Sequence, residues 1–146
     1  MITESKFQHI IGVARLCYKL AKEKYHANEE FARSMWAIGF NHDIGYEFIN
    51  DGDSTKEHPI IADNIIQHAF YGNCHAIEYH GKRVAQDDLQ LRILNEADLQ
   101  IDATGKLVTV EERLEDIRNR YGDNSDQYEQ AYCLALELGL IDFCSD

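Results

Sequence analysis

The sequence contains little that would interrupt or cross-link a helical fold. Its 146 residues include one proline, Pro59, and four cysteines, none of them in a CxxC pair. A disulfide framework or a zinc knuckle is therefore not expected, and Cys17 and Cys133, which fall among apolar residues, are expected to be buried free thiols. No apolar run approaches the roughly 20 residues of a membrane span, and the N-terminus lacks a signal-peptide core. These absences predict a cytoplasmic protein that has no membrane as a partner.

Basic residues are scarce as well. The chain has 14 of them against 26 acids, a formal net charge of −12. The imbalance is uneven: residues 1–86 carry 11 acids and 9 bases, whereas residues 87–146 carry 15 acids and 5 bases. Such a charge argues against a nucleic-acid polymer or an anionic membrane as the main partner. Because the N-terminal part is near neutral, the global charge does not exclude any class of ligand for it.

The apolar residues that are present recur with the period of a helix. Helices are predicted over residues 4–26, 29–41, 73–80, 87–103, 109–120 and 125–139, and a further one starts at His58-Pro59. We therefore expect an all-α fold, a compact bundle of six to seven helices that forms one domain over residues 1–146. Its acidic C-terminal helices would span about residues 109–141.

Polar residues interrupt this apolar pattern at several places. The pair His42-Asp43 ends an apolar helix, His9 lies on the apolar stripe of the first helix, and Asp98 takes a position where an aliphatic residue is expected. Taken alone, a helix-terminal His-Asp pair is typical of a cap or an ion pair. A buried aspartate is rarer and needs a cation or several hydrogen-bond donors.

Two further histidines strengthen the case for a metal. His58 opens one amphipathic helix, and His80 continues the apolar face of another. Imidazole and carboxylate side chains together suit iron, manganese, zinc or similar ions, and ligands from several facing helices form metal sites in helical cores. The other histidines, His26, His68 and His75, are expected at the surface or in packing roles.

In sequence order these residues resemble the HD superfamily of metal-dependent phosphohydrolases, whose pattern is H…HD…D. The similar stretches run from Phe7 to Ala14, from Phe40 to Gly45 and from Glu96 to Asp102. The resemblance covers about residues 5–103. His58 and His80 resemble the extra histidines of a six-ligand subset, H…HD…H…H…D, that holds two metal ions.

The resemblance implies an HD-domain-like fold and a six-residue ligand set. The metal ligands would be His9, His42, Asp43, His58, His80 and Asp98. The first metal would be held by His9, His42, Asp43 and Asp98, and the second by His58 and His80, with Asp43 as the bridge. The candidate catalytic residues are Asp43, His58 and His80. Two divalent ions are expected, iron or manganese first, with magnesium, zinc, cobalt or nickel as alternatives. Their shared hydroxide would attack phosphorus.

Other residues are candidates for supporting roles. Glu57, Glu96 and Asp102 are close enough in sequence to orient the ligating histidines. Lys82 and Arg83 directly follow His80 and are candidate phosphate-binding residues, although a solvated loop explains them as well. Tyr46 stands where many members of the superfamily have lysine and is a further candidate substrate-binding residue.

The expected activity is hydrolysis of a nucleotide or another small phosphate ester. An alternative is a mixed-valent di-iron oxygenase that cleaves a C–C or C–P bond, because some six-ligand HD proteins have that chemistry. Tyr46 leans slightly toward the oxygenase, since tyrosine can hydrogen-bond a substrate or an iron-bound oxygen species. A third possibility is a non-catalytic binding module, against which the intact ligand set argues.

Overall fold

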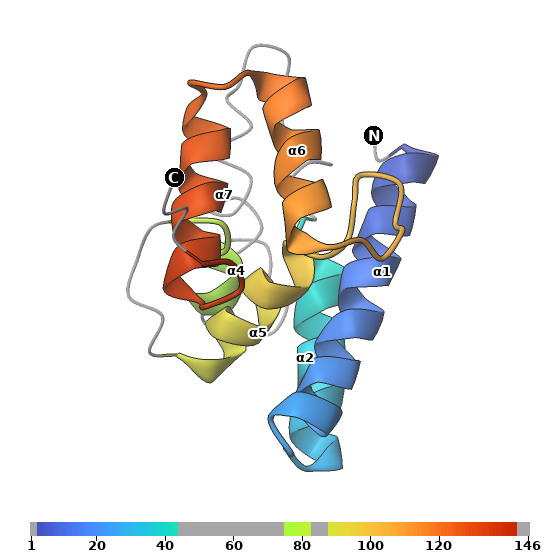
Figure 1. Cartoon of the computed structure of the whole chain (residues 1–146). Helices are drawn as coiled ribbons and strands as arrows, with labels where there is room; N and C mark the ends of the chain where they lie inside the picture. The colour runs from blue at the N-terminus through green and yellow to red at the C-terminus, as the bar shows by residue number, and fades with distance from the viewer. Residues whose placement is uncertain (1–2, 44–74, 83–87, 143–146) are drawn as a thin grey trace.

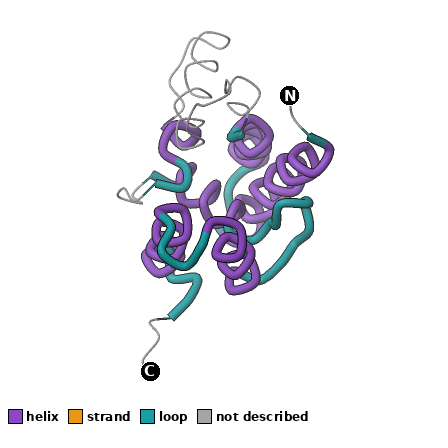
Figure 2. The backbone as a smooth tube through the Cα atoms, turned by 90° about the horizontal axis from the view of Figure 1, so that it is seen from above, coloured by secondary structure: helices purple, strands orange, loops and turns teal. Residues whose placement is uncertain are grey.

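The computed structural model describes residues 3–43, 75–82 and 88–142 (Figure 1). Its helices are α1 (Glu4–Lys19), the π-helix η1 (Leu20–Lys24), α2 (Glu29–Asn41), α4 (His75–Tyr79), α5 (Leu89–Asp98), α6 (Val110–Tyr121) and α7 (Asp126–Glu137). Within these ranges there is no strand, only one isolated bridge between Ile101 and Leu107. In Figure 2 the described residues accordingly appear only as helices and loops. The all-α expectation is confirmed, and the helix predicted from His58 lies outside the described residues.

Short polar side chains begin most of these helices. The N-caps are Thr3 for α1, Asn28 for α2, Asp88 for α5, Thr109 for α6 and Ser125 for α7. In each case the side-chain oxygen accepts a backbone N–H that the first turn leaves without a partner. None of the described helices has both the length and the apolar character needed to cross a membrane.

The helices α1 and α2 pack tightly because one residue between them is glycine. A Cβ atom on Gly39 would lie 2.8 Å from the Cα atom of Ala14 and 3.0 Å from Cys17 Sγ. Any larger residue would push the helices apart. This close contact brings the C-terminal end of α2, where His42 and Asp43 follow, toward the face of α1 that carries His9.

Helix α5 differs from the prediction at its C-terminal end. It stops at Asp98 rather than near residue 103. Beyond it, the carboxylate of Asp102 accepts the backbone N–H groups of Thr104 and Lys106 at 2.9 and 3.0 Å. An aspartate that captures nearby backbone donors favours a turn over a helix. The chain turns back at Gly105, whose φ of +92° suits glycine.

Two groups of buried apolar side chains hold the fold together. The first lies between α1, α2, α4 and α5 and includes Val13, Met35, Leu91 and Leu94, each fully buried. The second lies between the end of α5 and the hairpin of α6 and α7. Its members are Leu99, Val110, Leu114, Ala131, Leu134, Ala135 and Leu138. The two groups meet at the end of α5, where Asp98 precedes Leu99.

The cysteine prediction is correct for only one of the two residues. Cys17 is a free, fully buried thiol in the first core, where burial raises its pKa. Cys133 is also free but only half-buried. It lies on α7, and its side chain belongs to neither core.

Candidate metal centre

Five of the six predicted metal ligands belong to described residues, and the structure brings all five together. His9 lies in the middle of α1, His42 and Asp43 directly follow α2, His80 directly follows α4, and Asp98 is the last residue of α5. His58, the sixth, lies outside the described residues. Segments up to 89 residues apart in sequence thus meet at one place.

The three histidines share one feature, which is that Nδ1 of each faces a backbone carbonyl oxygen. The acceptors are Asp102 O for His9 at 2.8 Å, Gly39 O for His42 at 2.6 Å and Ile77 O for His80 at 2.6 Å. A carbonyl oxygen only accepts, so Nδ1 carries the proton. Nε2 is then the atom that faces the cluster, and this is how proteins orient histidines that ligate metals.

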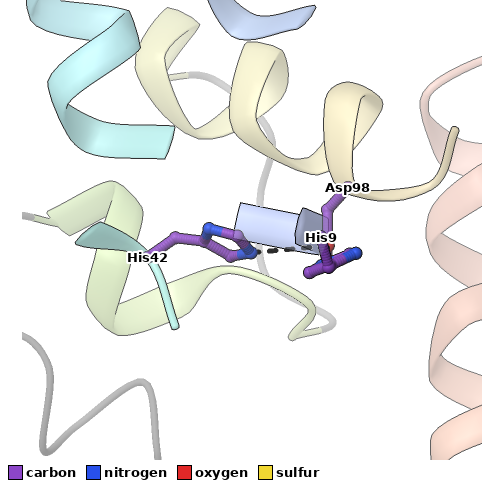
Figure 3. A group of neighbouring side chains, drawn as sticks. All are labelled: His9, His42 and Asp98. Carbon is purple, nitrogen blue, oxygen red and sulfur yellow. Dashed lines mark hydrogen bonds and ion pairs between the residues drawn. The ribbon is translucent and has the colours of Figure 1, made fainter. Parts of the chain in front are cut away.

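The Nε2 atoms meet the two carboxylates. His9 Nε2 lies 2.9 Å from Asp98 Oδ1, and His42 Nε2 lies 3.5 Å from the same oxygen. Figure 3 shows His9 and His42 pointing toward Asp98. These three side chains form one group whose potential ligand atoms all lie within 4.8 Å of one another.

Asp43 joins this group to His80. Its Oδ2 atom lies 3.1 Å from His42 Nε2 and 3.6 Å from His9 Nε2, while its Oδ1 atom lies 3.2 Å from His80 Nε2. His42, Asp43 and His80 therefore form a second group of potential ligands. The two oxygens of one carboxylate face different histidines, which is the arrangement that a bridging ligand requires.

The charges of the cluster shift the ionisation of its members. Burial alone would lower the pKa of His42, but the nearby carboxylates of Asp43 and Asp98 outweigh it and raise the pKa to about 10. Burial would raise the pKa of Asp98, but the nearby imidazoles of His42 and His9, the latter through a hydrogen bond, hold it well below its ordinary value. Without a metal, His42 is an imidazolium between two carboxylates, and a divalent cation would replace its proton.

The position of His42 fits a metal better than it fits a structural ion pair. Its Nε2 atom is fully buried and has no well-directed hydrogen bond among the described residues, although two carboxylates lie close. A buried polar atom without a well-directed hydrogen bond is costly in an ordinary core. Imidazole and carboxylate donors around such an atom match the preferences of iron, manganese and zinc.

A comparison of the sequence with known protein families identifies the family of the chain. Residues 7–100, well over half of the chain, match the HD domain family. The chain belongs to the HD domain family. The HD domain marks a superfamily of metal-dependent hydrolases, and the His/Asp cluster of this HD domain is compatible with a metal site. Neither the curated proteins nor the solved structures gave a significant match to the chain.

The side chains of two residues predicted to orient the ligating histidines have other roles in the structure. Asp102 does orient His9, but through its backbone carbonyl, because its carboxylate is used by the turn that follows. Glu96 is buried, yet it faces away from the cluster and binds Lys24 and the hydroxyl of Tyr25, the latter at 2.9 Å. Glu57 lies outside the described residues.

Asp98 is less enclosed than the sequence suggested. Its side chain is 23% exposed, whereas Leu94, one turn earlier, is completely buried. The reason is its place at the end of α5, where the first core gives way to a loop. The carboxylate therefore lies at the rim of the His/Asp cluster rather than in its interior.

Only one of the three candidate substrate-binding residues belongs to the described residues. Lys82 is described, and its Nζ atom lies 5.4 Å from the ring centre of Tyr79, over the aromatic face. Arg83 and Tyr46 lie outside the described residues. Of the histidines set aside, His75 is exposed and packs against Tyr79, and His26 is exposed after η1. The roles of Lys82, Arg83 and Tyr46 stay predictions.

Two contacts of the site were not found from the sequence. Lys6 Nζ lies 2.8 Å from Asp43 Oδ2. Asn95 accepts the backbone N–H of Gly81 at 2.8 Å, which fixes the turn after His80. Lys6 precedes His9 by three residues, so helical spacing could have placed both on one face of α1. Asn95 is a polar residue on a buried helix face, a signal similar to the one that revealed Asp98.

Proposed function

We propose that this HD domain protein is a metal-dependent phosphohydrolase that acts on a nucleotide or another small phosphate ester. The observation that carries the proposal is the convergence of three histidine Nε2 atoms on two carboxylates in a chain of this family. We further propose two metal ions, iron or manganese first, with the six-ligand set that adds His58. Asp43 would bridge them, because its two oxygens already face different histidines.

The side chains around the proposed centre support hydrolysis of an anionic substrate. A bound divalent ion lowers the pKa of a coordinated water and offsets negative charge on a phosphoryl group. The carbonyl oxygens of Asp102, Gly39 and Ile77 hold the imidazoles in one orientation, so that the ligand atoms need little rearrangement. The ammonium group of Lys6 beside Asp43 adds a positive charge where the phosphoryl group would bind.

A mixed-valent di-iron oxygenase is the second candidate function. Tyr46, in place of the lysine that many members of the superfamily carry, favours it. The metal ligands do not separate the two activities, because both use the same six residues. The reactions differ in their products: a hydrolase releases inorganic phosphate without oxygen, whereas an oxygenase consumes oxygen.

The test is metal analysis of protein purified without oxygen, followed by assays with added manganese or iron. We expect about two metal ions per chain and release of phosphate from at least one member of a panel of nucleotides and sugar phosphates. The control is Asp123→Ala, which removes an acid that is 82% exposed and far from the cluster in sequence. It should keep the metal content and activity of the natural protein.

Each alternative gives a distinct result. A mixed-valent iron signal in electron paramagnetic resonance, with oxygen uptake and no phosphate release, would replace the hydrolase by the oxygenase. One ion per chain would keep the hydrolase and remove the second-metal assignment of His58 and His80. A protein with no bound metal after loading with manganese, iron or zinc would refute the metal centre itself.

A further inference from the structure

A cavity of about 330 Å³ lies next to the proposed metal centre, between α1 and α6. Its lining includes His9, a predicted metal ligand, and three basic side chains: Lys6, Arg113 and Arg120. In Figure 1, α6 stands beside the N-terminal end of α1. The cavity therefore connects the cluster with a helix that lies beyond residues 7–100, the part that matches the HD domain family.

The charge of this cavity contrasts with that of its surroundings. Residues 87–146 carry only five basic residues, and two of them, Arg113 and Arg120, line the cavity. Arg113 is held in place, since Nε donates to the backbone carbonyl oxygen of Asp98 at 3.3 Å and a terminal nitrogen lies 3.2 Å from Asp116. Lys6 contacts Asp43 at the inner end. Arg120 has no ion pair with any other described residue.

The neighbouring Arg118 has different surroundings from Arg120. It pairs with Glu115 and lies 3.7 Å from Asp123, and it is not part of the cavity lining. Arg120 differs from it by two positions on the same helix and lines the cavity, with no acidic partner in the part of the chain that the structure describes. Tyr121, which is 44% exposed, lies beside Arg120 in the lining. An unpaired guanidinium at the edge of a cavity is a typical anion-binding group.

Helix geometry sets the spacing between the two arginines. Seven residues make almost two full turns, so Arg113 and Arg120 lie on the same face of α6, about 10 Å apart along its axis. Arg113 is next to the metal ligand Asp98, and Arg120 is at the far end of the cavity. An anion bound by Arg120 would therefore lie apart from a phosphoryl group at the metal centre.

We infer that this cavity binds a second phosphate group of the substrate, so that the preferred substrates are small molecules with two separated phosphates. The inference rests on the proposed hydrolase, since the first phosphate would lie at the metal centre. Lys6 would contact the group near the metal centre, and Arg120 would bind the distal phosphate through paired N–H donors. The C-terminal hairpin would then decide substrate selection through α6.

The test compares two matched variants, Arg120→Gln and Arg118→Gln, by isothermal titration calorimetry on metal-loaded protein. Two probes are used: hexyl phosphate, with one phosphate group, and hexane-1,6-diyl bisphosphate, with two. The natural protein should bind the bisphosphate at least about tenfold more tightly than the monophosphate, the effect of one added charge-assisted contact. Arg120→Gln should abolish this preference, and Arg118→Gln, which removes the same charge, should keep it.

Two results would overturn the inference: equal binding of both probes by the natural protein, or an equal loss of preference in the two variants. The second result would mean that only the total charge matters. A failure of the proposed hydrolase is seen separately. In that case no substrate of the panel releases phosphate, while the calorimetric preference for the bisphosphate and its dependence on Arg120 still report on the cavity.

Discussion

The two cores of this protein differ in what they bury. The first, between α1, α2, α4 and α5, encloses apolar residues together with His9, His42, Asp43 and His80, each less than 5% exposed. The second, between α5, α6 and α7, has no buried polar or charged side chain on α6 or α7 among the described residues. Its charged side chains, such as Arg118 and Glu115, pair at the surface. Both cores are helical, and both have well-formed N-caps.

This difference separates the residues that serve stability from those that serve function. Burying a carboxylate among imidazoles costs free energy unless a cation or hydrogen bonds compensate. A core retains such groups where they are needed for binding or chemistry. The second core has no such cost, and its contribution to function is positional: it carries α6, whose Arg113 and Arg120 line the cavity beside His9.

The largest expected effect is in the first core. Asp43→Ala removes the carboxylate that contacts Lys6 and all three described histidines of the cluster. Metal affinity should fall by more than about 100-fold, because losing a ligand costs at least as much as losing a group that orients one. Metal content after dialysis against a trace of manganese measures this. Full occupancy in the variant would remove Asp43 from the ligand set.

The second core is tested by Leu134→Ala, since Leu134 is 2% exposed. Such a substitution should lower the free energy of unfolding by about 2–5 kcal/mol, through lost burial and a residual cavity. Metal content per folded chain should stay unchanged. Urea unfolding and metal analysis give the two quantities.

The matched change Leu94→Ala, one turn before Asp98 in the first core, should reduce both stability and metal affinity. If Leu134→Ala also lost the metal, the two cores would not be functionally distinct.

A smaller effect is expected at the junction of the cores. A ligand that binds only the folded state stabilises it by about 2.7 kcal/mol at a hundredfold excess over its dissociation constant. Chelation should therefore lower the melting temperature of the natural protein by several degrees. In Asp98→Asn, which keeps the shape but removes the charge, the decrease should be clearly smaller. The measurement is thermal unfolding of both proteins with and without chelator, and equal decreases would show that Asp98 is not a ligand.

The smallest effect concerns the cysteines. Burial raises the pKa of the Cys17 thiol, so that less of it is thiolate at any given pH, and its full burial also blocks access. Cys133, half-buried on the second hairpin, should be alkylated by iodoacetamide at pH 8 well before Cys17. Peptide mass spectrometry distinguishes the two sites. Faster alkylation of Cys17 would indicate that the first core opens more readily than the second.

The sequence by itself determined the helical class and most of the site. Apolar residues at helical spacing report which face of a helix is buried, so His9, Asp98 and the pair His42-Asp43 were recognisable as polar residues where apolar ones belong. Their order also identified the family that residues 7–100 match. These are properties of single helices and of their succession, which a linear pattern records directly.

Only the tertiary structure decided what surrounds those residues. The contact of Lys6 with Asp43, the orientation of His9 by the carbonyl of Asp102, and the approach of Arg113 to Asp98 all join different elements. So does the binding of Glu96 by Lys24 and Tyr25, which removes it from the site. Such contacts depend on how closely helices pack and where each one ends, as at Gly39 and Asp98. The helical period of a sequence carries no information about those distances.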